Sequence, residues 1–165
     1  MRPFIKLFLF AFLAFSLWSC ADENLVFEEN VVFDKAKWAT SDRAVMEFQI
    51  DDTLSQHNFY LNVRNTESYP YRNLYVFVKT VFPNGKFSKD TVGVILADPT
   101  GKWLGDGSGY LSSSQHKSNT IMYQYNKRFP LKGEYKVEIE QAMRVDTLEG
   151  IRNVGLKIER IPFAR

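Results

Sequence analysis

The stretch from Leu74 to Gly107 reads LYVFVKTVFPNGKFSKDTVGVILADPTGKWLGDG, and it decides the fold. Its first nine residues place apolar side chains on both faces, which is typical of a strand covered on both sides. Asn84-Gly85 then supplies residues that adopt positive φ in a tight hairpin turn. Thr91–Leu96 returns as the partner strand. The stretch therefore predicts a central β-hairpin, followed by a glycine-rich loop that carries Trp103.

Short runs of alternating apolar and polar residues on either side of this hairpin predict further strands. They lie at Val31–Phe33, Val45–Ile50, Asn58–Arg64, Thr120–Tyr125, Tyr135–Ile139 and Val154–Ile158. Gln141–Gly150 fits either one helical turn or a loop. Seven or eight short strands separated by turn residues predict an all-β fold, a single jelly-roll-like antiparallel β-sandwich over residues 31–160.

Length and composition limit the alternatives. A chain of 165 residues suits one domain that buries a core without disulfide staples. Its content of 45% hydrophobic and 15% aromatic residues is typical of a folded protein rather than a disordered one. One cysteine excludes a disulfide or a cysteine-based metal site within the chain, and two histidines argue against a multi-histidine centre. We therefore expect no metal and no cofactor.

Residues 1–19 have the features of an export signal. Arg2 and Lys6 precede an apolar run, Leu7–Leu17, which is too short to cross a bilayer as a helix. The sequence Leu17-Trp18-Ser19-Cys20 resembles a bacterial lipobox, although Trp18 stands where a small residue is usual. We interpret Cys20 as a lipidation site, for a palmitate-type anchor. The alternative is an ordinary secretory signal whose cleavage leaves a free cysteine.

Residues 20–30 are expected to form an acidic tether between the lipid and the domain. The Asp22-Glu23 pair resembles the acidic export tags of some surface lipoproteins, or it belongs to a plain solvated linker. Two of the 21 basic residues lie in the signal, so 19 remain against 19 acidic residues. A mature chain this close to neutral gives no support for binding nucleic acid.

Several candidate sites compete with plainer interpretations. Asp98 and Asp106 suggest a calcium loop, but Trp103 occupies the sixth position, where an EF-hand needs glycine, so we interpret Asp98-Pro99-Thr100-Gly101 as a turn. Trp103, Tyr110 and Tyr123 are candidates for an aromatic platform that binds sugars, although aromatic residues more often fill a core. Trp103 and Tyr110 are retained as candidate binding residues.

Catalytic groups are not arranged for a known reaction. His57 and His116 lie far apart in the sequence, and no G-x-S-x-G elbow accompanies them, so we expect that the protein is not an enzyme. Glu134, Glu138 and Glu140 alternate along one predicted strand and indicate a solvated face.

The chain resembles the GldH family, gliding-motility lipoproteins of Bacteroidetes. The resemblance spans nearly all of the mature chain and rests on the lipobox and on runs of matching residues. These are FPNG at residues 82–85, LADPTGKWLG at 96–105, GEY at 133–135, EIEQAMR at 138–144, and GI, VGL and IE at 150–151, 154–156 and 158–159. It implies a cell-envelope protein, with the outer membrane favoured, that acts with other gliding lipoproteins and the type IX secretion apparatus. No catalytic activity is known for the family.

Two function classes therefore remain. The first is a lipoprotein of the gliding and secretion apparatus that works through protein contacts. The second is a surface-exposed lipoprotein that binds glycans. An apolar surface patch near Trp103 favours the first class, whereas a shallow groove lined by coplanar aromatic rings favours the second.

Overall fold

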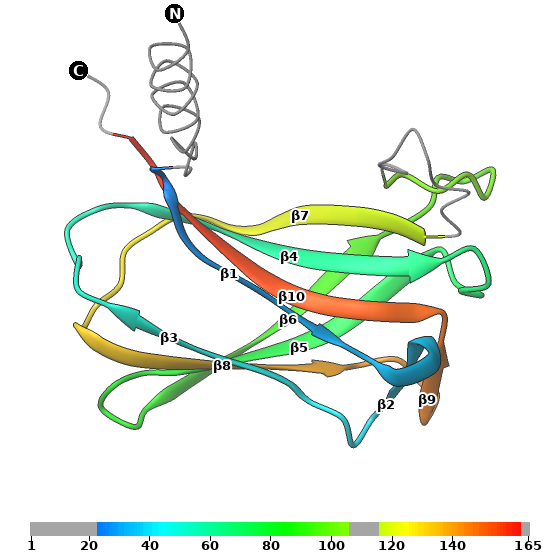
Figure 1. The fold of residues 1–165 in the computed structure, drawn as a ribbon, viewed down its shortest axis with the longest axis horizontal. Coiled ribbons are helices and arrows are strands. Elements are labelled where there is room, and N and C mark those ends of the chain that lie inside the picture. The colour runs from blue at the N-terminus through cyan, green and yellow to red at the C-terminus, as the bar shows by residue number, and fades with distance from the viewer. Residues whose placement is uncertain (1–22, 106–115, 163–165) are drawn as a thin grey trace, which may run out of the picture.

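The computed structural model describes residues 23–105 and 116–162, and these residues form an antiparallel β-sandwich (Figure 1). The elements are β1 (Leu25–Val32), η2 (Asp34–Ala36, a short 3-10 turn), β2 (Lys37–Ala39), β3 (Ala44–Ile50), β4 (His57–Thr66), β5 (Asn73–Val81), β6 (Phe87–Ile95), β7 (His116–Lys127), β8 (Gly133–Gln141), β9 (Thr147–Glu149) and β10 (Ile151–Arg160). The predicted fold class is confirmed.

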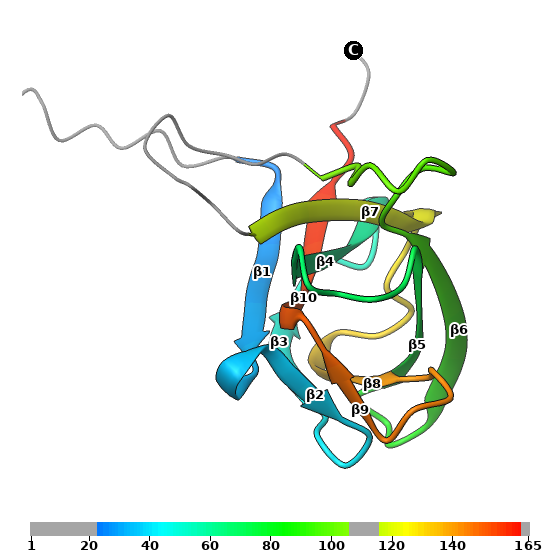
Figure 2. The same cartoon turned by 90° about the vertical axis from the view of Figure 1, so that its right-hand side faces the viewer.

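Two four-stranded sheets face each other. The first sheet has the order β1-β10-β4-β7, the second has the order β3-β8-β5-β6, and β2 with β9 forms a small ribbon at one end (Figure 2). Leu61 of β4 pairs with Leu156 of β10, and Phe48 of β3 pairs with Tyr135 of β8. These pairs turn the apolar side of each sheet toward the space between the sheets.

The core follows from the period-two alternation. In β3 every second residue is buried, including Met46, Phe48 and Ile50, as predicted. Tyr135 is fully buried, and its ring centroid lies 5.0 Å from that of Phe129. Each fully buried large apolar side chain contributes about 1.5–3 kcal/mol, so these alternating rows hold the two sheets together.

The chain enters the sheet earlier than expected. Strand β1 begins at Leu25 and pairs with β10 from Leu25 opposite Glu159 to Val32 opposite Asn153. Six residues of the stretch expected as a tether, Leu25 to Asn30, therefore belong to this strand.

The predicted hairpin forms, but it lies at the edge of a sheet, its strand β5 is not covered on both faces, and its turn differs from the one expected at Asn84-Gly85. Among the described strands, β6 pairs with β5 alone and lies at the edge of its sheet. The outer face of β5 is open, with Tyr75 46% exposed. The amide of Gly85 donates to the carbonyl of Phe82 (2.9 Å), and the amide of Phe82 donates to the carbonyl of Lys86 (2.8 Å). This is a three-residue loop, in which Gly85 has φ of +78° and Asn84 does not adopt positive φ.

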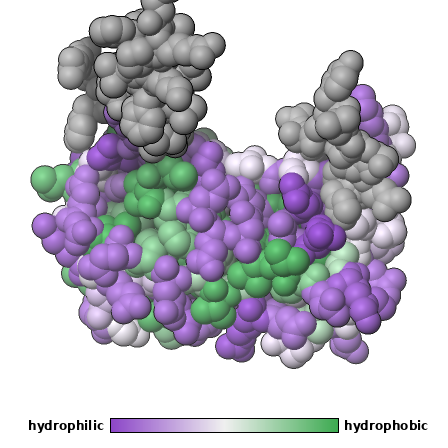
Figure 3. Space-filling model, viewed as in Figure 1, coloured by the Kyte–Doolittle hydropathy of each residue, from purple (hydrophilic) through white to green (hydrophobic). Residues whose placement is uncertain are grey.

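The sandwich has two ends. At the proximal end lie the start of β1, the β3–β4 loop, the β5–β6 hairpin, the β7–β8 loop and the end of β10. At the distal end lie the β4–β5 and β8–β9 loops, the segment after β6, and the β2–β9 ribbon (Figure 1). On the face seen in Figure 3, apolar side chains gather in separate patches between polar ones.

Candidate functional site

The structure describes one of the three residues singled out from the sequence. Cys20 and Tyr110 lie outside the described residues. Trp103 follows β6, forms an isolated bridge with Ala97, and is partly buried against the core. Its ring centroid lies 6.3 Å from that of Tyr69, whose side chain is buried. Trp103 thus points mainly inward and closes part of the distal end.

The loop around Trp103 is held by Asp98. One carboxylate oxygen, Oδ1, accepts hydrogen bonds from the amide and hydroxyl of Thr100 (2.8 and 2.7 Å) and from the amide of Lys102 (3.0 Å). The hydroxyl of Thr100 contributes most to a pKa of Asp98 below its usual value, and the backbone amides add to this effect. These bonds are those of a turn, in agreement with the interpretation from the sequence.

An apolar groove of about 500 Å³ lies at the distal end of the sandwich, on the outer face of the second sheet. Its apolar lining comes from the β4–β5 loop, from β5 and from the β8–β9 loop: Tyr71, Tyr75, Phe77, Met143 and Val145. Asn73, Thr91, Ala142 and Arg144 complete it. We call it the distal groove. The rings of Tyr71 and Tyr69 meet at 5.7 Å, and Tyr69 in turn lies near Trp103.

Gln141 shapes one wall of the groove. Its side chain is buried, Oε1 accepts from the amide of Met143 (2.9 Å), and Nε2 donates to the carbonyl of Val145 (2.7 Å). The Sδ of Met143 lies 3.4 Å from the amide nitrogen of Tyr75 on the neighbouring strand. In the segment left open as a helical turn or a loop, residues 142–146 form a loop, whereas Thr147–Glu149 form strand β9. Gln141 positions the two apolar side chains of this loop, Met143 and Val145.

Tyr75 lines the groove and is the residue of its apolar lining that is exposed to solvent. It pairs with Gly93 of β6, and its ring covers that glycine, because a Cβ on Gly93 would lie 2.7 Å from Cε1 of Tyr75. Ile95, which is 55% exposed, continues the apolar surface along the edge strand. A glycine here lets a large ring lie close to the sheet while it remains open to solvent.

Ion pairs mark the proximal border of the groove. Nζ of Lys89 lies 4.3 Å from the ring centroid of Phe77 and 3.7 Å from Glu140, and Arg43 binds Glu140 at 2.8 Å. Lys79 binds Glu138 at 3.3 Å. Because the Glu138 and Glu140 side chains are 12% and 21% exposed, the expected solvated face is covered by these cations. The outer face is thus apolar at the distal end and charged beyond it.

This arrangement suits contact with a protein. Exposed apolar side chains with a charged rim are typical of protein interfaces. Of the candidates for a sugar platform, Tyr110 lies outside the described residues. Trp103 packs near Tyr69 whereas Tyr123 packs near Phe59 at 6.4 Å, and both of these described rings are partly buried. The sequence did not single out Tyr75, Phe77 or Met143. For Tyr75 and Phe77 the signal is the second apolar face of β5, which the sequence pattern also shares with a covered strand.

The two histidines lie at opposite ends of the β4–β7 pair. His57 pairs with Lys127, and Thr66 pairs with His116. His57 is buried, and its Nδ1 has no hydrogen-bond partner among the described residues. Burial lowers the pKa of its imidazole. Within the described residues, no cluster of three or more metal-ligating side chains forms.

The fold and the groove define a β-sandwich domain with an apolar groove on the outer face of one sheet. Within the described residues, helices long and apolar enough to cross a membrane are absent. A model of the GldH lipoprotein family matches residues 25–158, and the chain belongs to this family, as its motifs predicted.

Two relatives support the assignment. The chain is 32% identical to a protein named gliding motility lipoprotein GldH homolog from Christiangramia forsetii, over 97% of this chain and 98% of that one. It is also 32% identical to the gliding motility lipoprotein GldH of Flavobacterium johnsoniae, over 89% and 91% of the two chains. Each match thus covers about nine-tenths or more of both chains.

Similarity to solved structures is slight. An uncharacterized protein from Listeria monocytogenes matches 70% of this chain and 8% of its own, with 17% identity and a TM-score of 0.35. Dimeric latent PorU from Porphyromonas gingivalis matches 86% of this chain and 14% of its own chain, with 8% identity and a TM-score of 0.35. Scores this low carry no argument about function.

Proposed function

We propose that this chain is a non-catalytic lipoprotein of the cell envelope that is required for gliding motility. A signal over residues 1–19 exports it, and a lipid on Cys20 holds it to a membrane, with the outer membrane favoured. It acts through contacts with other gliding lipoproteins and with proteins of the type IX secretion apparatus. Membership of the GldH lipoprotein family and the names of both relatives support this proposal.

The distal groove is the contact surface in this proposal. Its exposed tyrosine and its partly buried Phe77 and Met143 are the side chains that contribute most at protein interfaces, where aromatic residues and methionine are enriched. The ion pairs of Lys89 and Glu140 beside it would form the polar rim.

A photocrosslinking experiment tests the contact. A photoreactive phenylalanine analogue replaces Tyr75 in the groove, and in a matched control it replaces Tyr125, which is 67% exposed on β7 outside the groove. We expect cross-links from position 75 to a gliding lipoprotein or secretion-apparatus protein, identified by mass spectrometry, and a much weaker product from position 125. Equal products from both positions would exclude the groove as the contact.

The anchor is tested separately. Cys20→Ser should leave the domain folded and release it from membranes after a carbonate wash. A variant that still sediments with the membrane fraction would contradict the lipid anchor.

A second candidate function is glycan binding, and one feature favours it. The outer face of the first sheet has a polar groove of about 300 Å³, lined in part by Glu28, Asn30, Asn62, Arg64 and Thr120. Asn62 is nearly buried there, where it donates to Glu28 (2.9 Å) and accepts from Thr120 (3.0 Å). Such fixed amide and hydroxyl groups suit a polyhydroxylated ligand. Titration of the Cys20→Ser chain with oligosaccharides, observed at the Asn62 amide by NMR, tests it.

A further inference from the structure

The proximal end of the sandwich holds the incoming chain firmly. A guanidinium nitrogen of Arg160, Nη2, donates to the carbonyl of Glu23 (2.9 Å), and the backbone amide of Arg160 donates to the carbonyl of Asn24 (2.8 Å). The amide of the next residue, Ile161, donates to Gln56 of the β3–β4 loop (2.7 Å). The segment before β1 is therefore fixed to the end of β10 from residue 23 onward.

This attachment leaves little chain between the domain and a lipid on Cys20. Three residue steps separate Cys20 from Glu23, and a fully extended chain spans at most about 3.5 Å per residue. The carbonyl held by Arg160 therefore lies within about 10 Å of the lipidated residue. A connection this short brings the proximal end of the sandwich to the surface of the membrane.

The proximal end displays apolar side chains that no core contact explains. Leu54, at the tip of the β3–β4 loop, is 76% exposed and is the most exposed of the large hydrophobic residues described. Asp52 fixes the tip, because its Oδ1 accepts from the amides of Leu54 (2.8 Å) and Ser55 (3.1 Å). Phe87, the first residue of β6 after the turn of the β5–β6 hairpin, is 63% exposed at the same end.

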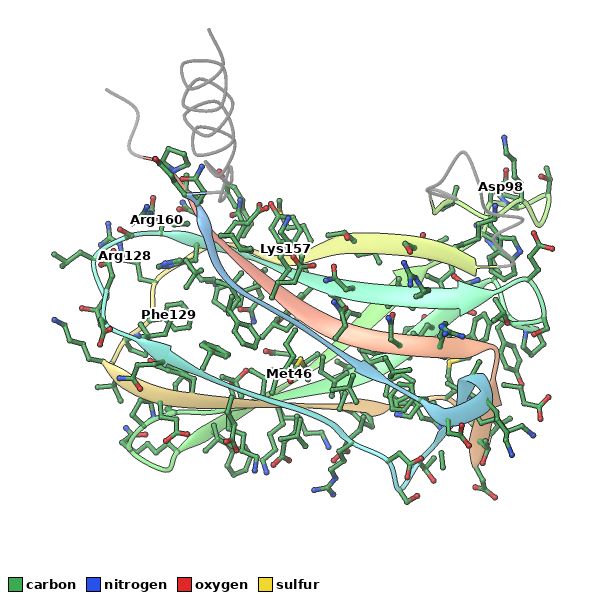
Figure 4. The ribbon with its side chains drawn as sticks, viewed as in Figure 1. Met46, Asp98, Arg128, Phe129, Lys157 and Arg160 are labelled. Atoms are coloured by element: carbon green, nitrogen blue, oxygen red, sulfur yellow. The ribbon has the colours of Figure 1, made fainter. Side chains whose placement is uncertain are left out.

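Basic side chains accompany these apolar groups. Lys127, Arg128, Lys132 and Arg160 are exposed at this end, and within the described residues Arg128 and Lys132 form no ion pair. Figure 4 places Arg128 and Arg160 together where the chain enters, with Asp98 at the opposite end. Asp51 and Asp52 in the β3–β4 loop and Glu134 at the start of β8 belong to the same end, so the net charge there is small. Arginine and lysine beside an apolar tip are groups that bind lipid phosphates at a membrane interface.

We infer that the proximal end of the sandwich docks on the lipid surface that holds the anchor. Leu54 lies at the boundary between headgroups and acyl chains, and Arg128 lies at the level of the phosphates. This inference rests on the proposed lipidation of Cys20. It also orients the domain, because β4 runs the length of the sandwich for ten residues, about 33 Å at 3.3 Å per residue. The distal groove then points away from the membrane, toward a partner.

Site-directed spin labelling tests this orientation in the lipidated full chain. Cys20 is the only cysteine, so Leu54→Cys carries a single label once the anchor has consumed the Cys20 thiol. The matched control is Leu104→Cys, at a leucine 56% exposed at the distal end. Both proteins are reconstituted in vesicles of phosphatidylethanolamine and phosphatidylglycerol. We expect several-fold lower accessibility to a water-soluble nickel reagent, and higher accessibility to oxygen, at position 54 than at position 104.

Two outcomes contradict the inference, and they are distinguishable. If the lipidated chain stays on the vesicles but both labels are equally accessible to nickel, the proposed docking of the proximal end is contradicted, whereas the proposed lipidation of Cys20 is not. If the wild-type chain does not sediment with membranes, the anchor fails, and the orientation fails with it.

A second measurement examines the phosphate contact without the anchor. The soluble Cys20→Ser chain is sedimented with vesicles that contain phosphatidylglycerol and with vesicles of phosphatidylcholine alone. Arg128→Gln should lower partitioning onto the anionic vesicles about fivefold, the value expected for one basic residue near such a surface. An unchanged partition coefficient would exclude Arg128 from the lipid contact.

Discussion

The ring of Tyr75 covers Gly93 on the neighbouring strand of the second sheet. The two residues are paired in register, and a Cβ built on the glycine would lie 2.7 Å from Cε1 and 3.2 Å from Cδ1 of the ring. The position of the exposed tyrosine thus depends on the absence of a side chain at residue 93. This dependence provides a way to disturb the distal groove without altering any residue of the core.

Gly93→Ala should therefore impair partner contact at little cost in stability. The new methyl group displaces the Tyr75 ring, which is 46% exposed and free to turn away, so the free energy of unfolding should change by less than about 1 kcal/mol. Cross-linking at the groove and gliding speed should both fall. Ser88→Ala, on the same strand but opposite Thr80, is the matched control. Normal gliding by a folded Gly93→Ala protein would show that the tyrosine has no part in the contact.

Gly85 in the β5–β6 loop should not accept a bulky side chain. Its φ is +78°, whereas no atom lies within 4 Å of the position of its missing Cβ. The penalty is therefore one of backbone conformation and not of space, so Gly85→Val should cost about 1–3 kcal/mol. Gly85→Asn should cost clearly less, because asparagine tolerates this conformation. Chemical denaturation of the three proteins checks the order, and equal midpoints would contradict it.

The sequence predicts the sandwich well because its strands alternate with period two. β3 and the end of β10 show this, since their buried residues are the predicted ones. β5 is different because it has apolar residues on both faces, a pattern shared by a fully covered strand and by a strand with an exposed binding face. Periodicity reports that a face is apolar but does not report what covers it.

The candidate site was harder to predict than the fold. Trp103 was expected either to fill the end of the sandwich or to dock a partner, and it is partly buried beside Tyr69. The distal groove depends on the side chain of Gln141, which binds the backbone at Met143 and Val145. A contact between a side chain and a loop leaves no periodic signal, so the sequence could not place these apolar residues together.

The two described tryptophans should differ in their contribution to stability. Trp38 is fully buried, its ring stacks on Phe33 with centroids 4.8 Å apart, and its Nε1 donates to the carbonyl of Asp42 (2.7 Å). Trp38→Ala should cost about 3–5 kcal/mol. Trp103→Ala removes a partly buried ring and should cost about half as much, roughly 2 kcal/mol. Urea denaturation measures both, and a larger loss for Trp103 would mean that the distal loop is part of the main core.

His57 should make the protein less stable in weak acid. The side chain is 2% exposed and lies edge-on to Phe129 at 5.0 Å, and Nδ1 has no partner among the described residues. Burial, the largest cause, lowers its pKa in the folded state, and the charge of Arg160 adds to this, while Asp52 opposes it. The unfolded chain takes up a proton near pH 6.5, before the folded protein does. The full contribution to stability is therefore present above about pH 6.5, and it is lost as the pH falls from there through the lower folded pKa.

The loss should amount to about 1.4 kcal/mol for each unit by which the folded pKa lies below the unfolded one. His57→Leu removes this titration, and His116 remains in both proteins, so the difference between their pH profiles isolates His57. In urea titrations between about pH 5 and pH 8, the free energy of unfolding of the wild type minus that of the variant should fall toward acid, because the His57 titration is present in the wild type alone. Parallel profiles would show that His57 titrates normally in the folded protein, and that water reaches the imidazole despite its burial.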